Sequence, residues 1–243
     1  YRDWVEYEVA LPVRDVKEVG AQPYFARGAF QFMKDLADNN DREWFSKNKP
    51  RYETHIKDAS LRFISDFAPY LKKLSPHFMA TPRSLFRIYR DTRFSKDKTP
   101  YKTHAGIHFR HEQAKNAHAP GYYLHIEPGE VFAGMGIWHP ESKALRAIRE
   151  HIVAEPAGWK KASRGKKFLG TVGLVGDKLS RPPKGFDPEH PLIEDLKFKD
   201  FIAITSLPQK FVLNSDLPKE LEQLFRAGTP FMRYLCDALN VPF

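Results

Sequence analysis

The sequence has a single cysteine, Cys236, among its 243 residues. One cysteine excludes a disulfide within the chain and a cysteine-based zinc site. The scarcity of cysteine suits a reducing compartment and so predicts a cytoplasmic protein. Cys236 falls in a helical pattern with no activating neighbour, so we expect its side chain to pack in the core.

Long apolar runs and several catalytic motifs are also missing. No stretch approaches the roughly 18 apolar residues that a membrane-spanning helix needs, and no segment resembles the hydrophobic part of a signal peptide. The sequence also lacks a phosphate-binding Walker loop, a serine-centred nucleophile elbow and an H-E-x-x-H motif. We therefore expect no membrane partner, no cofactor and no dedicated metal site.

Apolar and basic residues are abundant. Hydrophobic residues make up 42% of the chain and 19 residues are phenylalanine, which is enough for a core and excludes global disorder. The formal net charge is +9. A basic surface favours anionic partners such as nucleic acid or phosphorylated metabolites, but many basic proteins have no such partner, so clustering of the charges has to decide.

The first 24 residues differ in pattern from the rest. Apolar residues from Val5 to Val13 alternate with polar ones, as in a half-buried strand. Pro12 removes a backbone donor, which places this strand at the edge of a sheet. We treat residues 1–24 as an N-terminal extension and residues 25–243 as a single domain.

From Phe25 onward the apolar spacing is that of helices. Phe30 and Met33 share one helical stripe. Asn40 followed by Glu43 fits a capping box that opens a second helical stretch. Within that stretch Pro50 either kinks the helix or opens another, and we expect the helix to end near Pro69.

The middle of the chain is predicted to be rich in strands. A Pro-Gly pair within Glu127–Glu130 suits a type II turn between two of them. Helical patterns precede these strands and follow them. This order favours an α+β fold with a mostly antiparallel sheet of about five or six strands, flanked by helices. The predicted strands span 85–94, 103–110, 122–126, 131–138 and 201–207.

A dense run of charges occupies the first predicted hairpin. If residues 85–94 form one strand, Arg90 lies on the same face as Phe86, Ile88 and Phe94. A charge beside core residues needs an opposite partner, so Arg90 should pair with Asp91, Asp97 or Glu127. The opposite face would carry Arg87, Tyr89, Asp91 and Arg93.

The same run carries a long motif. Residues from Arg87 to Tyr101 fit the pattern R-x-x-R-D-x-R-F-x-x-x-(D/N)-K-x-x-Y, which resembles the signature of a bacterial and fungal family catalogued as domain of unknown function 2461. The segments 39–45, 121–123 and 181–186 are also similar to that family, and the resemblance extends over about residues 25–240. The family has no agreed activity, so the resemblance implies a location for a site and no reaction.

We predict that this hairpin binds an anionic ligand, either a phosphate-bearing small molecule or nucleic acid. Arginine offers a planar fork suited to phosphate, and basic residues interleaved with aromatic ones suit single-stranded nucleic acid. The alternative, of equal weight, is a structural network of ion pairs that needs no ligand. The candidate ligand-binding residues are Arg87, Arg90, Asp91, Arg93, Asp97, Lys98, Tyr101 and Lys102.

A second hypothesis is an enzyme acting on a phosphate ester. Asp91 and Asp97 would hold Mg²⁺, with Arg93 and Lys98 stabilising the transferred charge. This hypothesis ranks lower, because the surrounding cations compete for both carboxylates. The residues His104, His108 and His125 suggest a metal site or general base only weakly, and we expect half-exposed strand residues there.

A third hypothesis is an interaction module. The basic segment Trp159–Lys167 and the loop Leu179–Phe186 could contact an acidic partner. A solvated basic face explains the same residues without a partner, and we favour that interpretation.

Overall fold

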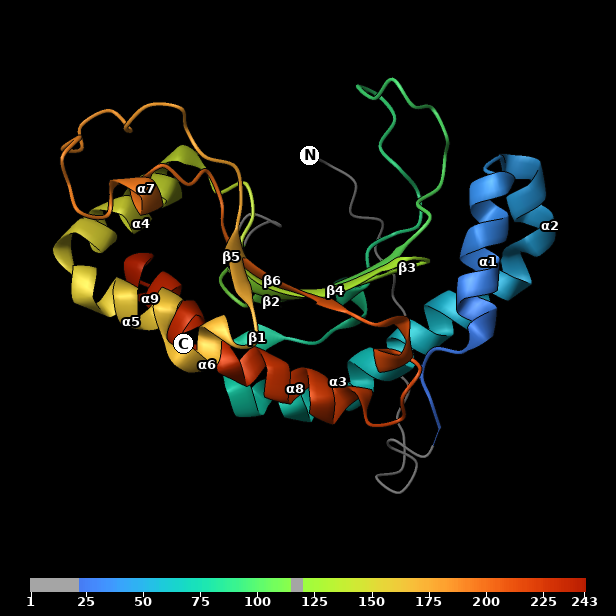
Figure 1. Cartoon of the computed structure of the whole chain (residues 1–243). Coiled ribbons are helices and arrows are strands. Elements are labelled where there is room, and N and C mark those ends of the chain that lie inside the picture. Colours follow the sequence, from blue (N-terminus) through green and yellow to red (C-terminus); the bar gives the residue numbers. More distant parts are fainter. Residues whose placement is uncertain (1–21, 115–119) are drawn as a thin grey trace.

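The computed structural model describes residues 22–114 and 120–243. Six strands form one antiparallel sheet in the order β1-β2-β3-β4-β6-β5 (Figure 1). The predicted α+β class with a mainly antiparallel sheet is confirmed. The edge strand predicted near Val5–Val13 lies outside the described residues. Across the described ranges no helix has both the length and the apolarity needed to cross a membrane.

Four of the five predicted strands, 103–110, 122–126, 131–138 and 201–207, agree closely with strands of the structure. Gly129 has a φ of 86° in the turn between β3 and β4, as a type II turn requires. The strand predicted at 201–207 is observed over the same residues. The strands are β1 (Phe78–Met79), β2 (Ala105–His111), β3 (Gly121–Glu127), β4 (Glu130–Ile137), β5 (Gly173–Val175) and β6 (Phe201–Leu207).

Helices precede, interrupt and follow the sheet. A wide π-helical turn at Glu53–Asp58 joins α2 directly to α3. The last two helices are separated at Gly228. The helices are α1 (Arg27–Asp38), α2 (Arg42–Tyr52), α3 (Ala59–Leu74), α4 (Ser142–Ala154), α5 (Pro156–Arg164), α6 (Lys166–Leu169), α7 (Ile193–Leu196), α8 (Leu217–Ala227) and α9 (Thr229–Ala238).

Pro69 does not end its helix, contrary to the prediction. The helix α3 continues through this residue to Leu74. Phe67 and Leu71 lie on either side of Pro69 and are both fully buried. Burial of two large apolar side chains stabilises this turn by several kcal/mol, which is enough to offset the backbone hydrogen bond that a proline removes.

The predicted capping role of Asn40 is also wrong. The carboxylate of Asp41 caps α2, accepting a hydrogen bond from the backbone N–H of Trp44 at 2.9 Å. The side-chain amide of Asn40 instead contacts the backbone of Tyr101 in both directions, accepting from its N–H at 3.0 Å and donating to its carbonyl at 2.9 Å. A partner 61 residues away in the chain is a tertiary feature that local pattern does not reveal.

One face of the sheet carries the hydrophobic core. Alternate residues of the central strands, such as Ile107 and Leu124, are fully buried on this face. The helices α3, α8 and α9 lie beneath it (Figure 1). Aromatic rings of the helices pack against rings of the sheet. The ring centroids of Phe67 on α3 and Phe109 are 4.9 Å apart, and those of Phe225 on α8 and Tyr122 are 4.7 Å apart.

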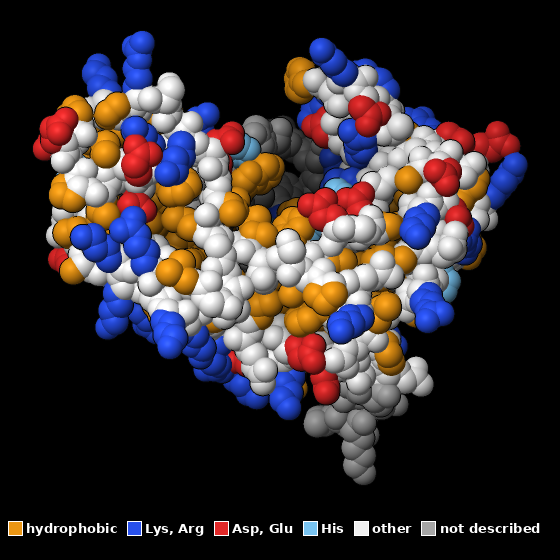
Figure 2. Space-filling view, in the orientation of Figure 1, with side chains coloured by type: hydrophobic (Ala, Val, Ile, Leu, Met, Phe, Trp, Pro, Cys, Tyr) orange, Lys and Arg blue, Asp and Glu red, His pale blue; other side chains and the backbone are white. Residues whose placement is uncertain are grey.

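The opposite face of the same strands is polar and glycine-rich. The pairing register places Gly106 opposite His125, and His108 opposite Tyr123. This face opens toward a hollow between the α4–α7 side of the molecule and the side that carries the charged hairpin, and Lys and Arg side chains gather on its rims (Figure 2). We call this surface of β2, β3 and β4 the polar face.

Candidate functional site

The charged hairpin is irregular at its base and not a pair of regular strands. Isolated bridges join Leu85 to Ile107 and Tyr89 to Tyr101, and the backbone N–H of Lys102 donates to the carbonyl of Ile88 at 2.8 Å. The prediction of a continuous strand over 85–94 is therefore wrong. From Pro100 toward its tip, the hairpin is held mainly by side chains. Pro100 itself has no N–H to donate.

The tip of the hairpin projects from the sheet. Phe94 was expected to share a core face with Phe86 and Ile88, but its side chain is 96% exposed. The guanidinium of Arg93 lies 6.0 Å from its ring centroid. The strict alternation of a strand therefore ends before Phe94, because no strand in the described part of the chain pairs with residues 91–99.

Both aspartates of the motif are paired with arginines. Arg90 donates to the carboxylate of Asp97 and to the hydroxyl of Thr99. Arg93 donates to Asp91 through Nε at 3.0 Å and Nη2 at 2.7 Å. The prediction that Arg90 needs a carboxylate partner is confirmed, and that partner is Asp97.

These pairs change the acidity of the carboxyl groups. The hydrogen bond from Arg90, together with bonds from Thr99, lowers the pKa of Asp97 to about 2. The hydrogen bonds from Arg93 hold the pKa of Asp91 well below its ordinary value. Each carboxylate is thus ionised and neutralised by a guanidinium, which leaves little reason for a Mg²⁺ ion to bind there.

Two further candidate residues serve the hairpin itself. Lys98 Nζ donates to the carbonyl of Thr92 at 2.8 Å and so closes the loop. Tyr101 is buried, and its ring stacks on Phe45 with centroids 4.1 Å apart. The ring of Tyr101 therefore anchors the hairpin to α2 and does not face the surface.

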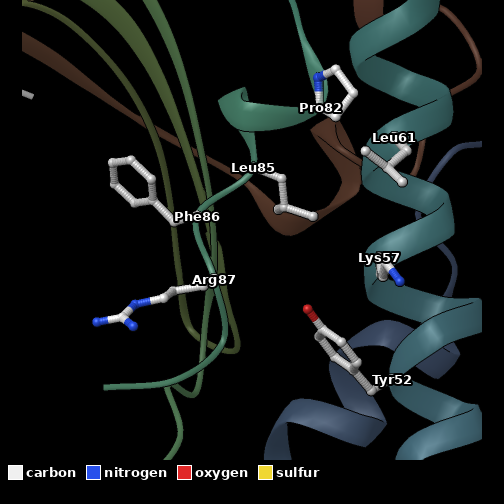
Figure 3. Close-up of a pocket in the computed structure, with 7 residues that line it drawn as sticks. All are labelled: Tyr52, Lys57, Leu61, Pro82, Leu85, Phe86 and Arg87. Atoms are coloured by element: carbon white, nitrogen blue, oxygen red, sulfur yellow. The ribbon is translucent and has the colours of Figure 1, made fainter. Parts of the chain in front are cut away.

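Two cations, Lys102 and Arg110, lie near the ring of Phe86 at the base of the hairpin. The ammonium of Lys102 lies 5.4 Å from the Phe86 ring centroid and the guanidinium of Arg110 lies 5.8 Å from it. Lys102 Nζ also donates to the carbonyl of Arg87 at 2.9 Å. Figure 3 shows Phe86 and Arg87 extending away from the helix that carries Lys57, whereas Leu85 points toward it.

Lys102 is half-buried and makes no ion pair with a carboxylate among the residues that the structure describes. Burial, and next the nearby charge of Arg87, lower the pKa of Lys102 to about 8. An ammonium group in such a place is costly unless an opposite charge compensates it. Of the eight candidate residues, Lys102 most clearly has an environment that an anion would improve.

Two cavities adjoin this region, and they differ in size. The cleft between Tyr52, Leu61 and Leu85 has a volume of about 20 Å³, which is room for about one water molecule. The second cavity borders the polar face and has a volume of about 300 Å³, at the lower end of the range for small-molecule sites. Its lining comprises Met79, Thr81, Arg83, Ser84, His108, Arg110 and Ala114.

Histidines on the polar face are more buried and more connected than expected. His108 and His125 are buried, so the prediction of half-exposed strand residues is wrong for both. His125 Nε2 lies 3.2 Å from Glu127 Oε2, and its ring centroid is 4.5 Å from that of His104. Burial, and next His125, lower the pKa of His104 to about 4.

Sequence reasoning missed the role of Glu127. It was considered as a partner for Arg90, but its carboxylate accepts from the hydroxyl of Thr103 at 2.6 Å and lies beside His125. The spacing of His125 and Glu127, two residues apart on one strand, places both on one face. The spacing of His125 and Glu127 was therefore visible in the sequence. The proximity of His104 to them was not, because it depends on the register of β2 against β3.

Comparison with known families agrees with the motif. A family model described as "Conserved hypothetical protein (DUF2461)" matches residues 28–234. The chain belongs to the DUF2461 family. No curated protein matches the sequence.

Membership in DUF2461 covers the hairpin, the polar face and the helices beneath the sheet, but the family description assigns no activity. In this DUF2461 chain the candidate residues divide into two groups. Arg90, Asp91, Arg93 and Asp97 bond to one another within the loop, whereas Arg87 and Lys102 lie at its base beside Phe86.

Proposed function

We propose that this DUF2461 protein binds a phosphate-bearing or otherwise anionic small molecule where the base of the hairpin meets the polar face. The observation that carries the proposal is the half-buried ammonium of Lys102, which makes no ion pair with a carboxylate in the described part of the chain. A bound anion would supply the missing opposite charge and recover part of the cost of burying the cation.

The surroundings of Lys102 support an anionic ligand. Arg110 approaches the same aromatic ring from β2, and Arg83 and Arg110 both line the cavity of about 300 Å³. Two guanidinium groups and an ammonium group raise the local positive potential, which attracts anions and speeds their association. A cavity of this volume favours a small molecule over a nucleic-acid strand, which would need an extended open groove.

The paired part of the motif supports the same proposal indirectly. Arg90 and Asp97 hold the loop closed, and the stack of Tyr101 on Phe45 anchors the hairpin to α2. A rigid hairpin keeps Lys102 in place before a ligand arrives, which reduces the ordering cost of binding. The ion pairs of the loop and the proposed anion site at Lys102 are then parts of the same hairpin, and the first would hold the second in position.

The test is phosphate binding by the full chain and by Lys102→Met, measured by calorimetry and thermal shift at low salt. A hydrogen bond to a charged group contributes about 1.5–3 kcal/mol, so loss of the ammonium should weaken binding about 10- to 100-fold. The melting temperature of the ligand-free variant should stay unchanged or rise, because the variant no longer buries an uncompensated charge.

Lys47→Met is the matched control. Lys47 is exposed and pairs with Glu43 one turn away on α2, so its removal should leave phosphate affinity unchanged. Nucleotides, sugar phosphates and short nucleic acids tested beside inorganic phosphate would define the ligand class. Equal stabilisation of the wild type and Lys102→Met by every anion would refute the proposed site, and tightest binding to single-stranded nucleic acid would replace the small molecule with a polymer.

A further inference from the structure

Three potential metal ligands converge on the polar face. His104 lies in the bend just before β2, while His125 and Glu127 lie on β3. Each residue offers one ligand atom, and these three atoms all lie within 4.8 Å of one another. We propose that His104, His125 and Glu127 form a binding site for a divalent transition-metal ion, with Zn²⁺ as the best fit.

The distances between the ligand atoms suit a site whose side chains move slightly closer together when a metal ion binds. Ligand atoms in a tetrahedral zinc site lie about 3.3 Å apart, since each bond is about 2.0–2.1 Å long. His125 Nε2 and Glu127 Oε2 are already 3.2 Å apart. The nitrogen of His104 needs to move by at most about 1.5 Å, the difference between 4.8 Å and the tetrahedral spacing, and its bend leaves it outside the hydrogen-bonded ladder of β2.

Neighbouring side chains orient two of the three ligands. The hydroxyl of Thr103 donates to Glu127 Oε1 at 2.6 Å, which leaves Oε2 facing His125. On the other side of the imidazole, the hydroxyl of Tyr123 lies 3.1 Å from His125 Nδ1. Metal-binding histidines and carboxylates usually have such oriented outer partners, which fix the ring or carboxylate and strengthen the ligand.

The shape of the sheet also holds these groups in place. The ring of Phe132 on β4 stacks on His125 with centroids 4.6 Å apart and planes at 8°. A Cβ atom at Gly106 would come within 2.6 Å of the Tyr123 hydroxyl, so the glycine leaves room for that hydroxyl over β2. The plane of the His125 ring and the position of its hydroxyl partner are therefore set by three strands.

His104 makes no hydrogen bond to any residue that the structure describes. This half-buried imidazole places a nitrogen within 4.8 Å of a carboxylate oxygen and of a nitrogen of a second imidazole, an arrangement that suits a shared metal ion. Two imidazoles and one carboxylate suit Zn²⁺ and similar ions and are poor ligands for Mg²⁺ or Ca²⁺, which prefer oxygen. Three protein ligands leave one position for water or for another ligand.

The experiment uses the full chain without an affinity tag, stripped with a chelator and kept in a phosphate-free buffer. Zn²⁺ is titrated in competition with a chromophoric chelator, and Co²⁺ is added separately to record its visible absorption. We expect one ion per chain and a tetrahedral Co²⁺ spectrum. His104→Gln and Glu127→Gln should each abolish the spectrum and weaken Zn²⁺ binding by more than the 10- to 100-fold typical of residues that only orient a ligand.

Two further variants separate metal binding from a structural role. Tyr123→Phe should weaken Zn²⁺ binding about 10- to 100-fold while the melting temperature of the metal-free protein falls by only a few degrees. His77→Asn is the matched control, because His77 also lies beside a glutamate, with Nδ1 at 2.6 Å from Glu112 Oε1, and its ring lies 6.0 Å from that of His111, but among the described residues these three do not form a group of ligand atoms within reach of one ion. It should bind Zn²⁺ like the wild type.

Either of two results would overturn the proposal. One is that the stripped wild type takes up neither Zn²⁺ nor Co²⁺. The other is that His104→Gln and Glu127→Gln bind Zn²⁺ as tightly as the wild type, which would place the ion elsewhere. Because Lys102→Met keeps all three ligands, it should still bind one Zn²⁺, so the metal site and the anion site can fail independently.

Discussion

At the scale of single residues, similar charges in one short segment have different tasks. Arg90 and Asp97 neutralise each other in an exposed loop, and Arg93 does the same with Asp91. Exposed pairs of this kind contribute little to stability, so their effect is to define the shape of the loop. Lys102 is set apart by its partial burial and by the lack of an ion pair with any carboxylate in the described part of the chain.

The pKa of Asp97 provides a direct test of its pairing. Arg90→Ala should raise the pKa of Asp97 from about 2 toward the ordinary value of 3.8, because the arginine hydrogen bond is the largest cause of the shift. Carboxyl carbon chemical shifts followed during an acid titration would measure it. Arg93→Ala is the control and should shift the titration of Asp91 instead, whereas an unchanged Asp97 titration in Arg90→Ala would contradict the pairing.

The same shift gives the pH dependence its sign. A carboxyl group whose pKa is lower in the folded state stabilises that state above its unfolded pKa. The contribution of the Arg90–Asp97 pair should therefore be complete above about pH 4 and disappear as the pH falls through about 2. Loop signals near Thr99, which bonds to Asp97, should change within this window.

At the scale of elements, the hairpin depends on a contact with the turn between α1 and α2. Asn40 bonds to both backbone groups of the buried Tyr101, and the Tyr101 ring stacks on Phe45 of α2. These contacts connect two segments that are 61 residues apart. They explain how an irregular hairpin, whose strand pairing in the described residues is limited to isolated bridges, keeps a defined position.

Removal of the Asn40 side chain should weaken this connection. In Asn40→Ala the backbone N–H and carbonyl of Tyr101 lose their partners, which should lower the free energy of unfolding by about 1–3 kcal/mol. Urea denaturation would measure the change, and hydrogen exchange should show faster exchange at the Tyr101 amide.

Asn39→Ala provides the comparison for that measurement. Asn39 donates only to the carbonyl of Asp35 at an exposed position, so its loss should change stability by less than about 0.5 kcal/mol. Equal effects of the two substitutions would show that Asn40 does not hold the hairpin.

At the scale of the whole molecule, the two faces of the sheet carry different kinds of side chain. Its covered face packs on α3, α8 and α9 and contains aliphatic and aromatic residues that are fully buried. Its polar face carries histidines, Tyr123 and Glu127, and this face opens toward the hollow seen in Figure 2. Adjacent residues on one strand therefore have different roles, since successive side chains point to opposite faces.

Neighbouring substitutions on β3 should show this division. Leu124→Ala removes a fully buried side chain and should lower the free energy of unfolding by about 2–5 kcal/mol. Tyr123→Phe removes one hydroxyl contact with His125 and should cost about 0.5–1.5 kcal/mol. Denaturant unfolding of the metal-free protein would measure both, and a larger loss for Tyr123→Phe would contradict the assignment of the two faces.

Much of the fold follows from local pattern. The apolar spacing predicts α1 and the ends of β6, because helices and strands repeat with different periods. Predictions failed where tertiary contacts outweigh local preference. Buried neighbours carry α3 through Pro69, and Asn40 bonds to a distant backbone instead of capping α2.

The sequence by itself determined the α+β class, the charged hairpin, the need of Arg90 for a carboxylate and the family. Each of these depends on residues close together in the chain. Only the tertiary structure decided that Lys102 is half-buried with no carboxylate partner among the described residues and that His104 approaches His125 and Glu127. These facts depend on the register of β2 against β3 and on which face the helices cover, and neither is a property of local sequence.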